Sequence, residues 1–219
     1  MKKKKKISSN FYDSSYFDTG IESKKSCYTN YKWLPDLTIP MAFKIMKYLN
    51  LSENNHILDF GCSKGYLVKA FRMLDIKAFG VDVSRYAIKN CDTEVKKYCK
   101  LISKEKYYPF KKNFDYVISK DVLEHLTVDQ IKYFLKFYKN KTNNMFHVVP
   151  LGDNGKYRIK EYHLDKSHLQ MNNEKWWENL FNSSGWKVEK FEYNVKGIKD
   201  SWYQNHKKGN GFFVLKKKI

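Results

Sequence analysis

One short stretch, residues 57–66, constrains the fold of this 219-residue chain more than any other. It reads Ile-Leu-Asp-Phe-Gly-Cys-Ser-Lys-Gly-Tyr, an apolar run that predicts a buried strand and then a turn with two glycines. A helix is expected directly after it, from Tyr66 to Leu74. Gly61 and Gly65 let the backbone approach a ligand, and the amides of the turn and the positive end of the helix face what binds there. The stretch therefore predicts a ligand-binding strand, turn and helix.

The spacing of the turn excludes two common nucleotide sites. A dinucleotide site requires G-x-G-x-x-G, but Ser63 and Tyr66 occupy the second and third glycine positions. A P-loop requires Gly-Lys-Ser/Thr at a fixed distance after Gly61, and the chain has none there. What remains is D-x-G-x-S-x-G, which resembles motif I of the class I S-adenosylmethionine-dependent methyltransferases, with Ser63 in place of the middle glycine. The resemblance implies that the methionine part of the cofactor S-adenosyl-L-methionine is held by Asp59, Phe60, Gly61, Cys62, Ser63 and Gly65.

A second acidic residue follows at the distance that this interpretation requires. Residues 78–84 predict a short strand with Asp82 near its end, 23 residues after Asp59, the length of a strand, a helix and a strand. An acid in this position can accept hydrogen bonds from both ribose hydroxyls, so we expect Asp82 and Val83 at the ribose. Ser84 is expected to cap the next helix.

The adenine side of the cofactor is the weakest part of the resemblance. Methyltransferases of this type often carry an acid before a Leu-Pro-Phe-like segment. Here Tyr108-Pro109-Phe110 is present, but the preceding residues 101–104 contain no acid. We expect backbone groups or Ser103 to hold the adenine.

The segment 113–126 is again specific. It predicts a fourth strand over 116–118, and the following Asp-Val-Leu-Glu-His-Leu resembles the helix start of small-molecule methyltransferases such as those of ubiquinone biosynthesis. Because strand ends form the ligand crevice of an open α/β sheet, Ser119, Lys120 and Asp121 are expected beneath the sulfonium. For Glu124 and His125 two interpretations stay open, pairing with neighbours behind the site and catalysis.

The connection 151–172 is long for a compact domain, and loops of this length are usually functional or disordered. Its Asp-x-Ser-His pattern before a Trp-bearing helix resembles the same segment of many such enzymes. A histidine has a suitable pKa for removing the proton of an acceptor hydroxyl, so His168 is the first candidate for a general base and His163 the second. The alternative is that these histidines cap a helix or close the loop by hydrogen bonds.

The order of elements predicts the architecture. Strands alternate with helices up to a fifth strand at 145–150, and strands at 187–193 and 211–215 finish the domain without a predicted helix between them. We expect a three-layer α-β-α domain with a doubly wound, mostly parallel seven-stranded sheet and an antiparallel C-terminal hairpin. It would occupy residues 40–219, after a basic disordered tail (1–10) and an aromatic N-terminal cap segment (11–39). Two interpretations of that cap stay open. In one, Tyr28 or Tyr31 covers the cofactor or the acceptor; in the other, the aromatic rings only close one edge of the domain.

The net charge of +19 raises the question of nucleic acid as a partner. Arginine occurs only at 72, 85 and 158, so 39 of the 42 basic residues are lysine, whereas phosphate readers usually use the arginine fork. We interpret the composition as that of an AT-rich genome and keep nucleic-acid binding as the alternative.

The four cysteines form no C-x-x-C pair and have no histidines at zinc-finger spacing. This predicts free thiols and no metal site. Because no signal-peptide core and no run of membrane-spanning length is present, we expect a cytoplasmic protein without a membrane partner.

Together these signals predict an S-adenosylmethionine-dependent methyltransferase that methylates an oxygen of a small molecule or sugar by in-line transfer. The Asn/Asp-Pro-Pro-Tyr/Phe motif of amino methylation on DNA bases is absent. The alternatives are a nucleic-acid (RNA) methyltransferase and a catalytically inactive cofactor-binding accessory protein.

Overall fold

A single seven-stranded sheet forms the centre of the computed structural model, which describes residues 6–103 and 105–218. The strand order is β3-β2-β1-β4-β5-β9-β8. Strands β3 to β5 run parallel, whereas β9 runs antiparallel to both β5 and β8, so the predicted doubly wound sheet with its antiparallel hairpin is confirmed. The strands are β1 (His56–Phe60), β2 (Lys77–Asp82), β3 (Cys99–Leu101), β4 (Tyr116–Lys120), β5 (Asn144–Pro150), β8 (Trp186–Glu192) and β9 (Asn210–Lys217).

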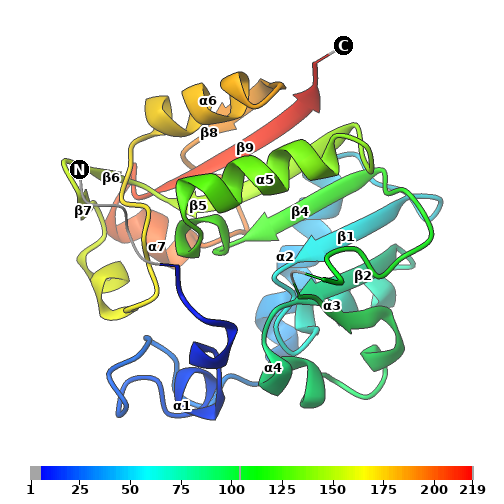
Figure 1. Ribbon diagram of the computed structural model, residues 1–219, viewed down its shortest axis with the longest axis horizontal. Helices are drawn as coiled ribbons and strands as arrows, with labels where there is room; N and C mark the ends of the chain where they lie inside the picture. Colours follow the sequence, from blue (N-terminus) through cyan, green and yellow to red (C-terminus); the bar gives the residue numbers. More distant parts are fainter. Residues whose placement is uncertain (1–5, 104, 219) are drawn as a thin grey trace.

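Helices cover both faces of the sheet, as the alternation of side chains along each strand requires (Figure 1). In β1, Ile57 is buried in the core beneath α2 and α3, whereas the next residue, Leu58, is buried in the core beneath α5 and α6. The predicted three layers are therefore present. Their helices are α2 (Pro35–Tyr48), α3 (Tyr66–Met73), α5 (Val128–Tyr138) and α6 (Glu174–Ser183).

Two helix starts show how local chemistry sets the boundaries. Helix α2 begins at Pro35, because proline fits the first turn of a helix, where its missing N–H is not needed. The start of α4 (Arg85–Lys89) is as predicted, since the Ser84 hydroxyl oxygen accepts a hydrogen bond of 2.9 Å from the backbone N–H of Ala87.

Two connections contain more structure than their sequences indicate. The 151–172 segment forms a small two-stranded sheet, β6 (Gly152–Asp153) and β7 (Lys156–Tyr157), followed by the 3-10 helix η4 (Lys160–Leu164). The connection between β8 and β9, predicted as a loop, contains α7 (Asp200–Asn205). These elements are too short to show a periodic pattern, because periodicity needs a window of about eleven or more residues.

The N-terminal segment is ordered over most of its described length. The first five residues of the predicted tail (1–10) lie outside the described residues. The 3-10 helix η1 (Ser9–Phe11) begins inside the predicted tail, and α1 (Ser14–Phe17) follows it. We call residues 6–34, which precede α2, the N-terminal cap.

The N-terminal cap joins two regions that are distant in sequence. Lys64, in the turn after β1, donates a hydrogen bond of 2.8 Å to Asp18 of the cap. On its other side the Tyr16 hydroxyl donates a hydrogen bond of 2.6 Å to Asp165, beyond η4. Figure 1 shows the cap near the ends of β1 and β4. No described helix is long and apolar enough to cross a membrane.

Candidate active site

The carboxyl ends of β1, β2 and β4 lie side by side where the order of the sheet reverses direction. Asp59 of β1 is level with Gly80 of β2 and Ile118 of β4. Beyond the strand, the Gly61 amide donates a hydrogen bond of 2.8 Å to the carbonyl of Val81. Open α/β sheets bind their ligands at this kind of edge, so the topology places the predicted site residues where a ligand is expected.

The turn after β1 has a left-handed backbone at three positions, Gly61 (φ +85°), Ser63 (φ +51°) and Gly65 (φ +80°). A Cβ at Gly61 would lie 2.5 Å from Val122, and one at Gly65 would lie 2.7 Å from the sulfur of Cys91, so both glycines are required by space as well as by conformation. Ser63 keeps the turn despite its side chain, at a conformational cost of about 1–2 kcal/mol.

Asp82 ties this turn to the end of β2. Its Oδ2 accepts a hydrogen bond of 2.8 Å from the backbone N–H of Ser63, and its Oδ1 accepts one of 2.7 Å from the N–H of Ser84. A carboxylate has about four acceptor sites, so both oxygens keep capacity for a ligand hydroxyl. The buried hydroxyl of Ser63 has no hydrogen-bond partner among the described residues, which leaves a polar atom for a ligand to meet.

Asp59 is buried at this edge, with 4% of the residue exposed against 9% for Asp82. Burial, with a further contribution from the charge of Asp82, raises the pKa of Asp59 to about 7. A cationic group bound nearby would favour the ionised carboxylate. Asp59 and Asp82 together therefore suit a positively charged ligand, such as one that carries a sulfonium and an ammonium.

At the end of β4, Asp121 lies between two lysines. Lys120 donates a hydrogen bond of 2.6 Å to its Oδ2, and Lys199 donates one to its Oδ1. Despite burial, these two cations hold the pKa of Asp121 well below its usual range. Asp121 is thus ionised, and the two lysines balance its charge.

Two predicted cofactor residues use their side chains elsewhere. The Ser119 hydroxyl lies 2.8 Å from Nδ1 of His147, inside the sheet, so its side chain does not reach the ligand edge. The Ser103 hydroxyl is exposed and donates a hydrogen bond of 2.8 Å to Glu105. Ser103 follows β3 at the expected edge, but this side chain must rotate before it can hold an adenine.

Of three more predicted residues, two have side chains buried in the cores and one is exposed at the ligand edge. Phe60 and Cys62 are buried in the two cores on opposite faces of the sheet. Burial raises the pKa of the Cys62 thiol to about 12, so this cysteine is an inert core residue. Val83 is 39% exposed beside Asp82, where it can contact a ligand from the side.

Tyr31 of the N-terminal cap lies over the glycine turn. Lys64 donates a hydrogen bond of 3.0 Å to its carbonyl, and its ring stacks on Tyr66 with 5.4 Å between the centroids. Burial, with the nearby charge of Asp59, raises the pKa of the Tyr31 phenol. These contacts place Tyr31 beside the glycine turn, and covering of the cofactor by this ring stays a prediction.

The two candidate bases have different surroundings. The backbone N–H of Tyr157 donates a hydrogen bond of 3.0 Å to Nε2 of His163, so this histidine closes the loop in the way that the alternative interpretation describes. Nδ1 of His168 lies 2.9 Å from the carbonyl of Tyr162 and therefore carries the proton. Its Nε2 presents a lone pair, and burial lowers the pKa of His168 to about 4.

Glu124 and His125, in the 3-10 helix η3 (Leu123–His125), lie next to His168. The Glu124 residue is 0% exposed, and neither of its carboxylate oxygens has a hydrogen-bond partner among the described residues. Nε2 of His168 lies 4.0 Å from one of these oxygens, and the two imidazole rings are 4.6 Å apart. The three side chains, of which Glu124 is fully buried and the histidines are partly buried, form a group that we call the Glu–His–His cluster.

Sequence reasoning missed the residues that support this site. Lys199 is one of many lysines, and nothing in its surroundings singles it out. Asp165 and Ser167 stand in the Asp-x-Ser-His pattern, which indicated only His168. The juxtaposition of Glu124 with His168 depends on a loop conformation that no local pattern reveals.

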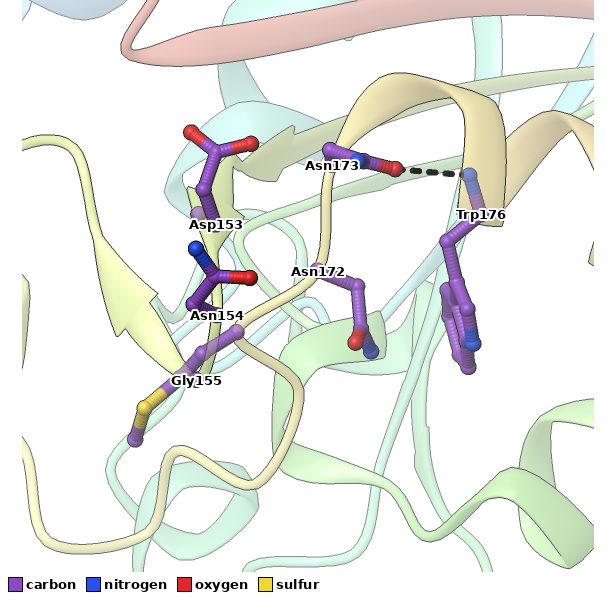
Figure 2. A pocket seen from close by; sticks show the side chains of 8 residues that line it. Asp153, Asn154, Gly155, Asn172, Asn173 and Trp176 are labelled. Atoms are coloured by element: carbon purple, nitrogen blue, oxygen red, sulfur yellow. Dashed lines mark hydrogen bonds between the residues drawn. The ribbon is translucent and has the colours of Figure 1, made fainter.

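Figure 2 shows a separate hollow between the β6–β7 turn and the start of α6. Asp153 is the ionisable residue in its lining, and it is already paired with Arg158. The Asn173 side chain accepts a hydrogen bond of 3.0 Å from the N–H of Trp176 and serves as the cap of α6. We therefore place the active site at the sheet edge and not in this hollow.

Comparisons with known proteins agree with this geometry. A family model described as "Methyltransferase domain" matches residues 39–191. A search of curated protein sequences found no match. Among solved structures, an S-adenosylmethionine-dependent methyltransferase from Clostridium acetobutylicum has a TM-score of 0.61 at 11% identity, over 84% of this chain and 92% of that one.

Two further solved structures are of methyltransferases with more specific names. The mitomycin 7-O-methyltransferase MmcR has a TM-score of 0.61 at 12% identity, over 82% of this chain, which spans only 54% of that protein. Magnesium protoporphyrin IX methyltransferase from Synechocystis, with bound S-adenosylhomocysteine, has a TM-score of 0.56 at 11% identity, over 82% of this chain and 83% of that one. At these identities the likeness supports the fold.

The sheet order, the ligand edge and the family match define a class I methyltransferase fold with an S-adenosylmethionine site. The chain belongs to the methyltransferase-domain family, and the predicted enzyme class and cofactor are confirmed.

Proposed function

We propose that the protein transfers the methyl group of S-adenosyl-L-methionine to an oxygen of a small molecule or sugar. The observation that carries this proposal is the Glu–His–His cluster, which lies beside the ligand edge and offers buried, polar, proton-accepting atoms. The structural likeness to MmcR, a mitomycin 7-O-methyltransferase, is in accord with it.

The roles of the cofactor residues follow from their positions. The glycine turn with Asp59 would hold the methionine part and Asp82 the ribose. Asp121, paired with Lys120 and Lys199, would form part of the floor beneath the sulfonium. Tyr31 would exclude water from above, which strengthens electrostatic interactions in the closed site. The residues thus fit the cofactor, although Ser119 and Ser103 would act through their backbone or after rearrangement.

When bound, the cofactor supplies an activated methyl group, so the protein mainly aligns and desolvates the acceptor. The acceptor oxygen forms a bond to the methyl carbon, the carbon–sulfur bond breaks with its electron pair passing to sulfur, and the hydroxyl proton must leave. Nε2 of His168, whose lone pair is free, stays the predicted acceptor of that proton in the cation-free protein.

Isothermal titration with S-adenosylhomocysteine tests the cofactor site first. We expect saturable binding by the wild type, and the absence of binding would refute the function. A screen with methyl-labelled cofactor against saccharides, phenols and RNA then identifies the acceptor, and label on RNA alone would replace the small-molecule assignment. Binding without methyl transfer to any acceptor would support the accessory-protein alternative.

Nucleic acid keeps a place in this screen because of the charge of +19. Non-specific attraction by lysines falls steeply between low and physiological salt. A labelled RNA product that persists at physiological salt would separate enzymatic recognition from this attraction.

A further inference from the structure

The Glu–His–His cluster combines three side chains of the kinds that bind metal ions. One ligand atom from each of Glu124, His125 and His168 lies within 4.8 Å of the other two. The side chains of Glu124 and His168 are 1% and 6% exposed. Metal–ligand bonds of about 2.0–2.2 Å place the ligand atoms of a tetrahedral site about 3.4 Å apart, so these atoms must move together by up to about 1.4 Å when an ion binds.

The hydrogen bonds around both histidines fix the tautomers that a metal ion needs. Nδ1 of His168 donates to the carbonyl of Tyr162, which leaves Nε2 unprotonated. The Ser167 hydroxyl donates its proton to Asp165 at 2.5 Å, so it accepts from Nδ1 of His125 at 2.8 Å. The lone pair of His125 is therefore also on Nε2.

This arrangement matches the outer shell of known metal sites. Histidines that bind metal ions usually donate their other ring N–H to a carbonyl, a carboxylate or a similar acceptor, which fixes the orientation of the ring. Here one histidine donates to a carbonyl, and the other donates through Ser167 to the carboxylate of Asp165. Tyr16 of the N-terminal cap completes this network by donating to the second oxygen of Asp165.

The buried carboxylate of Glu124 supplies the independent observation. A carboxyl group without hydrogen bonds in the interior is costly to bury, because its desolvation is not offset by any partner. Its backbone carbonyl is held by the N–H groups of Leu169 and Gln170, so η3 and the segment beyond His168 are fixed to each other. A cation would provide the partner that the two carboxylate oxygens lack.

We propose that Glu124, His125 and His168 bind a divalent transition-metal cation, and that an oxygen of the methyl acceptor occupies one of its open coordination positions. Two imidazole nitrogens and one carboxylate oxygen suit zinc, manganese or ferrous iron better than magnesium or calcium, which prefer oxygen ligands. The role in methyl transfer rests on the proposed function, whereas the binding of the cation does not. The sequence predicted no metal site because its cysteines lack metal-binding spacing. The proposed site replaces that prediction, since it contains no cysteine.

The cation changes how the acceptor proton leaves. It would withdraw electron density from the bound hydroxyl and lower its pKa, so the hydroxyl would lose its proton to solvent on binding, before its oxygen forms the bond to the methyl carbon. The carbon–sulfur bond breaks as the oxygen–carbon bond forms, with its electron pair passing to sulfur. In the loaded protein Nε2 of His168 is a ligand, and it no longer accepts the proton itself.

The test uses the full chain, freed of metal by a chelator and then desalted. Manganese is the first probe, because the three buried cysteines bind it poorly, and the free ion is counted by electron paramagnetic resonance. We expect one manganese ion per chain and its displacement by one equivalent of zinc. The absence of saturable binding would overturn the proposal.

Variants connect the binding to the cluster. Glu124→Gln keeps the shape of the side chain and removes its charge, so we expect binding to be lost, and His168→Gln gives a second test if the first variant does not fold. Ser167→Ala should weaken binding by about ten- to a hundred-fold through the outer shell. His206→Gln, at an exposed histidine, is the matched control and should bind as the wild type does. Unchanged affinity in folded Glu124→Gln would show that the ion binds elsewhere and would refute the site.

Calorimetry with S-adenosylhomocysteine separates the two proposals. Manganese binding without cofactor binding would refute the proposed function and leave the cation site intact. Cofactor binding and methyl transfer that persist in the metal-free protein at the same rate would refute the role of the cation in the reaction.

Discussion

Replacing Gly61 with alanine tests whether the glycine turn is required by its contacts as well as by its backbone conformation. Gly61 follows β1 with φ +85°, and an added Cβ would lie 2.5 and 2.9 Å from the two methyl carbons of Val122. Val122 directly follows Asp121 at the end of β4. The substitution therefore pushes apart the two strand ends that would hold the cofactor.

Two energetic contributions are expected. A left-handed backbone costs a residue with a Cβ about 1–2 kcal/mol, and overpacking a filled site costs about 1–3 kcal/mol. Gly61→Ala should thus destabilise the fold by about 2–5 kcal/mol. Gly155 is the matched control, since it has φ +78° but no atom within 4 Å of an added Cβ, and Gly155→Ala should cost only about 1–2 kcal/mol.

Urea denaturation gives the free energies of unfolding, and calorimetry gives the affinity for S-adenosylhomocysteine. Combining Gly61→Ala with Val122→Ala removes the two close methyl carbons, so in that background the alanine at 61 should cost about 1–2 kcal/mol, the conformational part alone. Equal costs for Gly61→Ala and Gly155→Ala, or no relief from Val122→Ala, would refute the steric argument.

Three other outcomes are expected. Asp82→Ala leaves the Ser63 N–H without its acceptor, so it should lower the free energy of unfolding in urea by about 1–3 kcal/mol. It should also lower the affinity for S-adenosylhomocysteine by about tenfold or more, and an unchanged affinity would show that Asp82 does not bind the ribose. Lys199→Met removes one of the two cations beside buried Asp121 and should destabilise the protein by about 1–3 kcal/mol, whereas an unchanged midpoint would show that the other lysine suffices. Burial lowers the pKa of His147 to about 3, so between about pH 6.5 and pH 3 the unfolded chain binds a proton that the folded protein does not. The free energy of unfolding should therefore fall by up to about 5 kcal/mol as the pH drops through this range. The non-titrating variant His147→Asn should show a shallower decline, and the same slope in both proteins would contradict this assignment.

The predicted fold agrees with the structure where the signals are local. Asp59, Asp82 and the glycine turn were correctly placed at one edge, because the carboxyl ends of parallel strands must meet there. The start of α2 at Pro35 and the helix α7 were not predicted, since a proline can begin a helix as well as interrupt one and six residues are too few for a periodic pattern.

Among the site residues, the sequence predicted the position of the backbone better than the direction of the side chain. Strand position correctly put Ser119 near the carboxyl end of β4, but its hydroxyl faces His147 inside the sheet. His163 and His168 looked alike in sequence, and only their hydrogen bonds distinguish the loop-closing histidine from the one with a free lone pair.

The sequence by itself determined the alternation of the main strands and helices, the glycine turn and the class of cofactor, because each depends on short motifs and on the spacing between them along the chain. The tertiary structure alone decided what surrounds Glu124, which atoms of His125 and His168 are free, and that Lys199 neutralises Asp121. These contacts join residues far apart in the chain, and their geometry depends on how loops fold over the sheet edge rather than on any repeating pattern. The chemistry proposed for the acceptor depends on those contacts, so it became visible only in the folded protein.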